Sequence, residues 1–235
     1  MAQPILRIEG VSVHFPVRKG VLQRQVAKVK AVENVTLSLN RGEAFGLVGE
    51  SGCGKTTLAR TVLRLVNATE GAIWFDGQNI TELKGVSLTP YRKRVAAVFQ
   101  DPFSSLNPRM KAGATITEVL KVHQYAGDIK ARVIELMGLC GLSERFVELY
   151  PHQMSGGQRQ RVGIARALAI EPDLIVCDEA VSALDVSIQA QIINLLEDLR
   201  VRLNLTYLFI GHDLSIVRHL CDRVAVMYLG RVMET

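Results

Sequence analysis

The stretch that decides the fold is Ala44-Phe45-Gly46-Leu47-Val48 followed by Gly49-Glu50-Ser51-Gly52-Cys53-Gly54-Lys55-Thr56. The first five residues form a short apolar run, which is typical of a buried strand. The next eight match G-x-x-x-x-G-K-[ST], and the residues after them carry apolar side chains at helical spacing. A glycine-rich turn that leads into a helix start directs backbone N–H groups and a positive dipole toward an anion. The stretch therefore predicts an α/β fold with a phosphate-binding loop.

Each residue type in this loop suits a nucleotide. Glycines let the backbone approach phosphate oxygens without a Cβ in the way. Lys55 is expected to reach the β- and γ-phosphates, and the Thr56 hydroxyl is expected to bind Mg²⁺. The predicted nucleotide contacts of the loop are Gly49, Ser51, Gly52, Cys53, Gly54, Lys55, Thr56 and Thr57. A glycine-rich turn with a purely structural role is the alternative.

Length and composition exclude several classes of protein. The chain has 235 residues, of which 48% are hydrophobic and 22% charged, so it is expected to be globular rather than disordered or collagen-like. The apolar run 224–229 is far shorter than the roughly 20 residues that span a bilayer, and the first ten residues do not resemble a secretory signal. The four cysteines form no C-x-x-C pair, which favours reduced thiols in a cytosolic protein.

Helices and strands alternate along the last third of the chain. Helical patterns at 155–169, 185–202 and 214–220 alternate with apolar strands at 174–177, 206–210 and 223–228. This order predicts a parallel sheet covered on both faces, with the helical stretch 115–150 inserted into it. Near the start, strands are expected around 6–13 and 35–39.

Two shorter segments in the first half of the chain predict a loop and a turn. The run 18–30 holds five cations and no acid, and it is expected to be a solvated loop. Asp76-Gly77 follows an apolar run and predicts a hairpin turn.

Two acids, Asp178 and Glu179, follow the apolar run Leu174-Ile175-Val176-Cys177. Carboxylates at the carboxyl end of such a strand lie where open α/β sheets bind ligands. Asp178 is expected to hold Mg²⁺, and Glu179 to orient or deprotonate an attacking water. Helix capping is the alternative role for this pair.

A further helix start, Ser155-Gly156-Gly157-Gln158, has the residues of a capping box. Two glycines in a first turn weaken a helix by roughly 1 kcal/mol each, and a cap does not need them. Close approach to an anion does need them, so the segment suggests a second phosphate-facing helix start. Because the phosphate-binding loop already serves one γ-phosphate, this second start is expected to face the nucleotide of a neighbouring protomer.

The glycine-rich loop, Ser-Gly-Gly-Gln and the strand ending in Asp-Glu, in this order, resemble the ATP-binding cassette (ABC) ATPases. The resemblance implies that Phe15 stacks on adenine and that Gln100, in the Q-loop, contacts Mg²⁺ and the attacking water. It also implies that Asp185 closes the D-loop Ser182-Ala183-Leu184-Asp185 and that His212 is the switch histidine. The expected catalytic residues are Lys55, Gln100, Glu179 and His212. The signature motif consists of Ser155, Gly156, Gly157 and Gln158.

The same resemblance implies the architecture. It indicates a P-loop NTPase (RecA-like) core with a mostly parallel sheet, an antiparallel β subdomain and an inserted helical subdomain. The whole chain, 1–235, is expected to be one ATPase domain. The β subdomain and the core would take 1–100 and 157–235, and the helical subdomain 101–156.

The segment Gln100-Asp101-Pro102-Phe103-Ser104-Ser105-Leu106-Asn107-Pro108-Arg109 resembles the ATPases of oligopeptide, dipeptide and nickel importers. This implies an ATP- and Mg²⁺-dependent subunit of a peptide importer, in a head-to-tail dimer with an identical or paralogous cassette. Two membrane permease subunits, and indirectly an extracytoplasmic solute-binding protein, would be its partners. The subunit would lie peripherally on the cytoplasmic face of the cell membrane.

Several alternatives remain open. Another cargo such as nickel fits the same importer group. An ABC ATPase acting on DNA or ribosomes usually carries coiled coils or two cassettes, so no nucleic-acid partner is expected. A GTPase would need an N-K-x-D motif, a small-molecule kinase has no use for Ser-Gly-Gly-Gln, and a binding-only regulator would not need Lys55, Asp178 and Glu179 together.

Overall fold

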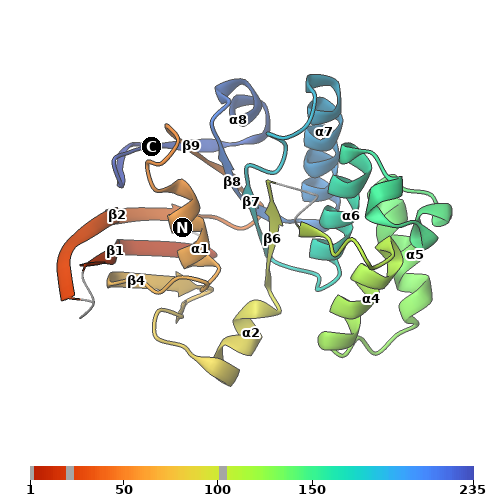
Figure 1. Cartoon of the computed structure of the whole chain (residues 1–235), viewed down its shortest axis with the longest axis horizontal. Coiled ribbons are helices and arrows are strands. Elements are labelled where there is room, and N and C mark those ends of the chain that lie inside the picture. The colour runs from red at the N-terminus through yellow and green to blue at the C-terminus, as the bar shows by residue number, and fades with distance from the viewer. Residues whose placement is uncertain (1–2, 20–23, 101–104) are drawn as a thin grey trace. The chain divides into compact units, whose positions relative to one another are not determined.

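The computed structural model describes residues 3–19, 24–100 and 105–235, and the chain forms two compact units (Figure 1). The first unit comprises Met1–Tyr91 and Leu208–Thr235, and the second comprises Arg92–Tyr207. Among the described residues, no helix combines the length and the apolar character that a membrane crossing requires.

An antiparallel sheet in the order β2-β1-β4-β5 begins the first unit. Its strands are β1 (Leu6–Lys19), β2 (Arg24–Leu39), β4 (Glu70–Phe75) and β5 (Gln78–Asn79). Leu6 pairs with Leu39 and Ile8 with Leu37, and these four side chains are buried. Alternation of apolar and polar residues therefore puts one face of β1 and β2 into the core.

The basic run 18–30 is not the loop that its charges suggested. Strand β1 extends to Lys19, strand β2 begins at Arg24, and these two residues are register partners; residues 20–23 lie outside the described residues. Val26 and Val29 favour a strand, because β-branched residues are common in strands. The antiparallel pairing supplies hydrogen bonds to the backbone N–H and C=O groups, while Lys28 and Lys30 remain exposed. A charge run predicts exposure, but it does not predict an irregular backbone.

The Asp76-Gly77 turn between β4 and β5 is confirmed. Both residues have positive φ angles, +50° and +78°, which a two-residue type I′ hairpin requires.

The rest of the first unit surrounds the phosphate-binding loop. Strands follow the order β10-β9-β3-β8, in which β9 runs parallel to β3 and β10 antiparallel to β9. The strands are β3 (Ala44–Val48), β8 (Thr206–Gly211), β9 (Arg223–Tyr228) and β10 (Arg231–Glu234). The helices are α1 (Lys55–Val62), a 3₁₀ turn (Gly85–Leu88), α2 (Thr89–Arg92) and α8 (Leu214–Leu220). All five residues of β3 are buried, as its apolar sequence predicts.

The second unit combines two parallel strands with helices. Strands β6 (Val95–Phe99) and β7 (Leu174–Asp178) pair in parallel, and Arg94 and Asp173 form an ion pair just before them. The helices are α4 (Ala112–Val122), α5 (Ile129–Leu139), α6 (Gly156–Leu168) and α7 (Val186–Leu203), with 3₁₀ turns at Glu144–Glu148 and Pro151–Gln153. The parallel pairs β3–β9 and β6–β7 confirm the predicted α/β class. The proposed subdomain limits, 1–100 with 157–235 and 101–156, stay a prediction.

Candidate nucleotide-binding and catalytic site

The phosphate-binding loop joins β3 to α1 in the first unit. Lys55, the first residue of α1, is only 4% exposed. Its Nζ donates to the carbonyl oxygens of Gly49 and Glu50, at 2.8 Å each, and lies 3.8 Å from the Cys53 Sγ. The loop thus holds the ammonium group against its own backbone. Three residues of the loop and helix start that carry hydroxyl groups remain accessible in part or fully: Ser51, Thr56 and Thr57.

Gly54 is required by close backbone packing as well as by conformation. It precedes α1 with a left-handed φ of +110°, and a Cβ there would lie 2.2 Å from the carbonyl oxygen of Ala31 on β2. On the other side of the loop, the N–H of Gly230 donates to the Cys53 carbonyl oxygen at 2.8 Å. The loop is therefore clamped between β2 and the β9–β10 turn.

Phe15 lies on β1 and pairs with Val29 of β2. On β2, Val29 lies two residues before Ala31. Its side chain is 42% exposed, so it is available to stack on a flat ligand. Because Ala31 contacts Gly54, the strand that pairs with Phe15 also touches the phosphate-binding loop. The first unit therefore joins the predicted base contact to the predicted phosphate contact through β2.

His212 is also in the first unit. It is exposed and follows β8, which neighbours β3 in the sheet. The adjacent Asp213 caps α8, accepting hydrogen bonds from the Ser215 Oγ and N–H. The hydrogen bond from the Ser215 hydroxyl is the main cause of a lowered pKa at Asp213. The Ser215 N–H and the neighbouring His212 lower this pKa further.

The second unit brings Gln100, Asp178 and Glu179 to one edge. In the parallel register Phe99 lies opposite Asp178. Gln100 and Glu179, the next residues after β6 and β7, therefore follow neighbouring strand ends. Asp178 is 7% exposed, Glu179 is half-buried and Gln100 is exposed. A carboxylate pair and an amide at the carboxyl ends of parallel strands form a polar edge suited to a ligand.

Glu179 has a left-handed backbone, with a φ of +50°. A residue with a Cβ in this region is strained, and such strain persists only where the surroundings hold it. Here the Ser182 N–H and Oγ both donate to the Glu179 carbonyl oxygen, at 3.1 and 3.0 Å. The sharp turn directs the chain out of β7 and fixes the backbone of the predicted catalytic carboxylate.

The predicted capping box at the signature motif is present. The Ser155 Oγ accepts from the Gln158 N–H at 3.3 Å, and the Gln158 Oε1 accepts from the Ser155 N–H at 2.9 Å. Ser155 is exposed, so this helix start is accessible.

The glycines of the signature motif have a packing role that sequence reasoning missed. A Cβ at Gly157 would lie 2.4 Å from the Ile188 Cγ2 of α7, and one at Gly156 would lie 3.2 Å from the Leu184 Cδ2. Packing against α7 is therefore a second reason for a glycine at position 157, and the expected approach to an anion stays a prediction. The start of α6 packs tightly on the D-loop and the first turn of α7.

Asp185 ends the D-loop and caps α7. Its Oδ1 accepts from the Ser187 Oγ at 2.7 Å and the Ile188 N–H at 3.0 Å, and these bonds, the hydroxyl one first, lower the pKa of the carboxyl group. Gln189 was not predicted as a site residue. Its Nε2 donates to the carbonyl oxygens of Val181 and Leu184, at 3.1 and 2.9 Å, and braces the D-loop from inside α7.

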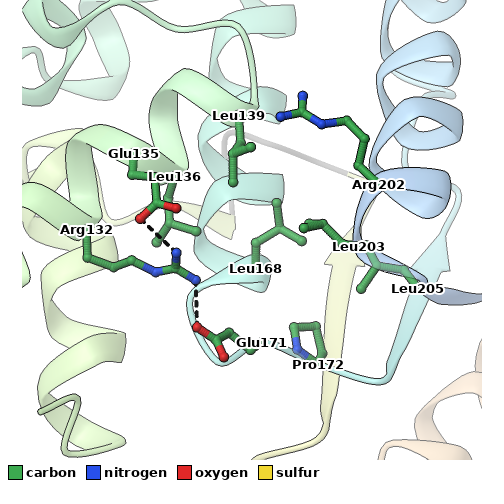
Figure 2. Close-up of a pocket in the computed structure, with 10 residues that line it drawn as sticks. All are labelled: Arg132, Glu135, Leu136, Leu139, Leu168, Glu171, Pro172, Arg202, Leu203 and Leu205. Atoms are coloured by element: carbon green, nitrogen blue, oxygen red, sulfur yellow. Dashed lines mark hydrogen bonds and ion pairs between the residues drawn. The ribbon is translucent and has the colours of Figure 1, made fainter. Parts of the chain in front are cut away.

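A cavity of about 520 Å³ in the second unit lies among α5, the end of α6 and the end of α7 (Figure 2). Arg132 lies at its edge and forms ion pairs with Glu135 and Glu171, at 2.8 Å each. Pro172 lines it and precedes β7, whereas Asp178 closes that strand. The cavity is therefore at the opposite end of β7 from the candidate site, and none of the predicted site residues lines it.

The chain is similar to several known proteins. The ABC transporter family model matches residues 32–182. The oligopeptide transport ATP-binding protein AppF of Bacillus subtilis (strain 168) is 54% identical over 99% of this chain and 71% of its own length. The glutathione import ATP-binding protein GsiA of Pectobacterium atrosepticum is 48% identical over 99% of this chain and 38% of its own length.

Among solved structures, the dimeric post-hydrolysis state of the ATP-binding cassette MJ0796, bound to ADP and Pi, superposes with a TM-score of 0.85. It is 30% identical, over 97% of both chains. The expected P-loop NTPase architecture is thereby confirmed. The match of the family model and the similarity over nearly the whole chain show that this protein belongs to the ABC transporter ATPase family.

Proposed function

We propose that the chain is the ATP-hydrolysing subunit of an importer for peptides. The family supplies the ATPase activity, and the cargo class is supported by AppF, whose name describes oligopeptide transport. The observation that carries the catalytic assignment is the β6–β7 register, which puts Gln100 beside Asp178 and Glu179.

In the proposed reaction each residue acts on a defined part of ATP. Phe15 stacks on adenine, and Lys55 with the N–H groups of its loop binds the phosphates. Glu179 accepts a proton from water as the water oxygen bonds to the γ-phosphorus, and the bond to the β–γ bridging oxygen breaks to give ADP and phosphate. Such a general base contributes about 10²–10⁴ in rate. Gln100 and His212 position the water and the γ-phosphate.

The donor set fits Mg²⁺. Thr56, Gln100 and Asp178 offer a hydroxyl, an amide and a carboxylate oxygen, which are the hard donors that this ion prefers. No cluster of three His, Cys, Asp or Glu residues that could hold a metal occurs among the described residues. Mg²⁺ is usually held by one or two protein carboxylates together with substrate phosphates and water. Mg²⁺ would supply charge neutralisation at the β- and γ-phosphates.

The signature motif is proposed to act on a second copy or a paralogue. Ser155 is exposed at the start of α6, as a contact in trans requires. In a head-to-tail dimer, Ser155, Gly156, Gly157 and Gln158 of one cassette would cover the γ-phosphate held by the other, with Asp185 beside them. The dimeric state of the MJ0796 cassette supports the dimer itself.

The remaining partners are proposed from the family. The helical insertion, which includes α4 and α5, would dock on the membrane permease, whose two subunits receive cargo from an extracytoplasmic solute-binding protein. The chain would then lie peripherally at the cytoplasmic face of the membrane. No nucleic-acid partner is proposed.

The decisive experiment is Glu179→Gln. The variant is expected to bind ATP, form a dimer visible by size-exclusion chromatography, and hydrolyse ATP at least about 100-fold more slowly, because the amide cannot accept the proton. Glu171→Gln is the matched control, since Glu171 has the same left-handed φ of +50° and lies at the other end of β7. Near-normal turnover in Glu179→Gln would refute the catalytic assignment. The cargo is tested by reconstituting the complete transporter and comparing ATPase stimulation by oligopeptides, glutathione and nickel.

A further inference from the structure

The 3₁₀ turn Pro151–Gln153, directly before the signature motif, carries one of two stacked flat side chains. The rings of Tyr150 and His152 have centroids 5.6 Å apart and planes inclined by 13°, a spacing within the range that aromatic pairs prefer. Tyr150 is half-buried and also has the Lys111 Nζ 6.0 Å from its ring centroid, whereas His152 is exposed. The imidazole of His152 is therefore the ring of this pair that is open to a further contact.

The backbone of this turn is held by several hydrogen bonds. Pro151 is buried and has a fixed φ, and its carbonyl oxygen accepts from the Arg159 Nε and the Met154 N–H. The Gln153 Oε1 accepts from the Tyr150 N–H at 2.8 Å, and the Tyr150 carbonyl oxygen accepts from the Gln153 N–H at 2.9 Å. Because Arg159 belongs to α6, the stacked pair is fixed to the helix that begins at the signature motif.

An exposed imidazole on a rigid support is suited to stacking on another flat group. Little conformational freedom is lost when a ligand packs on a ring that is already held, so more of the contact energy appears as affinity. Nucleobases are flat and stack on aromatic side chains, histidine included. In the proposed function Ser155 would cover the γ-phosphate held by the partner cassette. Three residues span at most about 11 Å, so His152 stays within reach of that same nucleotide.

We propose that His152 stacks on the adenine of the nucleotide that is bound by the partner cassette. The proposal rests on the proposed function, and it adds a base contact in trans to the phosphate contacts of the signature motif. Phe15 of one cassette and His152 of the other would both contact the same base. The closed dimer would then favour nucleotides with a large flat base, whereas binding to a single cassette would depend on Phe15 and Lys55.

The test uses the Glu179→Gln chain as the parent, because it is expected to form an ATP-bound dimer. The ATP concentration that gives half of the dimer, measured by size-exclusion chromatography, is expected to rise about tenfold when His152→Ala is added, since a stacking ring is lost. Adding His152→Phe instead keeps a flat ring and should leave this concentration within about twofold of the parent value. The Kd of a fluorescent ATP analogue, measured at protein concentrations too low for dimers, should stay within about twofold in both variants, because Phe15 and Lys55 are unchanged.

A second nucleotide and a second histidine provide the controls. CTP carries a smaller base that stacks more weakly, so His152→Ala should raise the CTP requirement for dimerisation less than the ATP requirement. The ratio of the two concentrations should therefore fall in this variant. His219→Ala removes another exposed imidazole, outside the turn, and should leave the ATP requirement at the parent value.

Four results would overturn the proposal. They are an unchanged ATP requirement in His152→Ala, no recovery in His152→Phe, an equal rise in His219→Ala, and the same CTP-to-ATP ratio in His152→Ala and its parent. The last result would indicate that His152 contacts the partner protein and not the base. Failure of the proposed function is distinguishable, since the Glu179→Gln parent itself would then not dimerise with ATP.

Discussion

The contact between Gly157 and Ile188 gives the sharpest prediction about the signature helix. In Gly157→Ala, the new Cβ would lie 2.4 Å from the Ile188 Cγ2, far inside van der Waals contact. Overpacking of this kind costs about 1–3 kcal/mol. Replacing glycine by alanine in a helix stabilises it by about 1 kcal/mol. When this gain is subtracted from the cost of overpacking, the variant is expected to be less stable than wild type by roughly 0–2 kcal/mol.

Gly163→Ala on the same helix is the matched control. A Cβ at Gly163 meets nothing within 4 Å outside the helix's own backbone, so this variant keeps the gain of about 1 kcal/mol without a clash. Because the propensity gain is common to both, the two variants should differ by about 1–3 kcal/mol. For a chain of this size, that corresponds to roughly 2–12 °C in Tm, with Gly157→Ala the lower, measured by calorimetry.

Removing the Ile188 Cγ2 should cancel the effect. In an Ile188→Ala background, Gly157→Ala is expected to become stabilising, giving a coupling energy of about 1–3 kcal/mol in a double-mutant cycle. Equal Tm values for Gly157→Ala and Gly163→Ala, or additivity within about 0.5 kcal/mol in the cycle, would show that the packing argument is wrong.

Two further predictions concern charged groups of the first unit. Lys55→Ala should weaken ATP binding by about 10–100-fold in a fluorescence titration, because a charge-assisted donor to phosphate is lost; unchanged affinity would remove Lys55 from the nucleotide site. Hydrogen bonds from Lys30, the larger influence, and from Arg231 lower the pKa of Glu33 from its ordinary 4.5 to about 2. The ionised carboxylate therefore contributes its full stabilisation above about pH 4.5 and loses it as the pH falls to 2. Glu33→Gln should therefore flatten the dependence of Tm on pH between about 4.5 and 2, and high salt should reduce the difference since the group is exposed. Identical pH profiles for the two proteins would contradict this linkage.

Local patterns predicted many elements well. The helix 214–220 and the strand 223–228 match α8 and β9, because short apolar runs between polar turns have few alternatives. The helical spacing after the phosphate-binding loop extends from Lys55 to Val66, whereas α1 ends at Val62. Residues 18–19 and 24–30 of the basic run lie in the paired strands β1 and β2, because charge predicts exposure whereas pairing depends on the partner strand.

The amino-acid sequence alone determined the chemistry of this protein. The order of the glycine-rich loop, Ser-Gly-Gly-Gln and Asp-Glu identifies a phosphate-transferring cassette, because these residue types act through their own functional groups and local backbone. Tertiary structure alone decided how those groups are held. The clamp of Ala31 on Gly54 and the fit of Ile188 over Gly157 both join residues distant in sequence. Such contacts depend on distances of a few ångströms between packed elements, which no local pattern specifies.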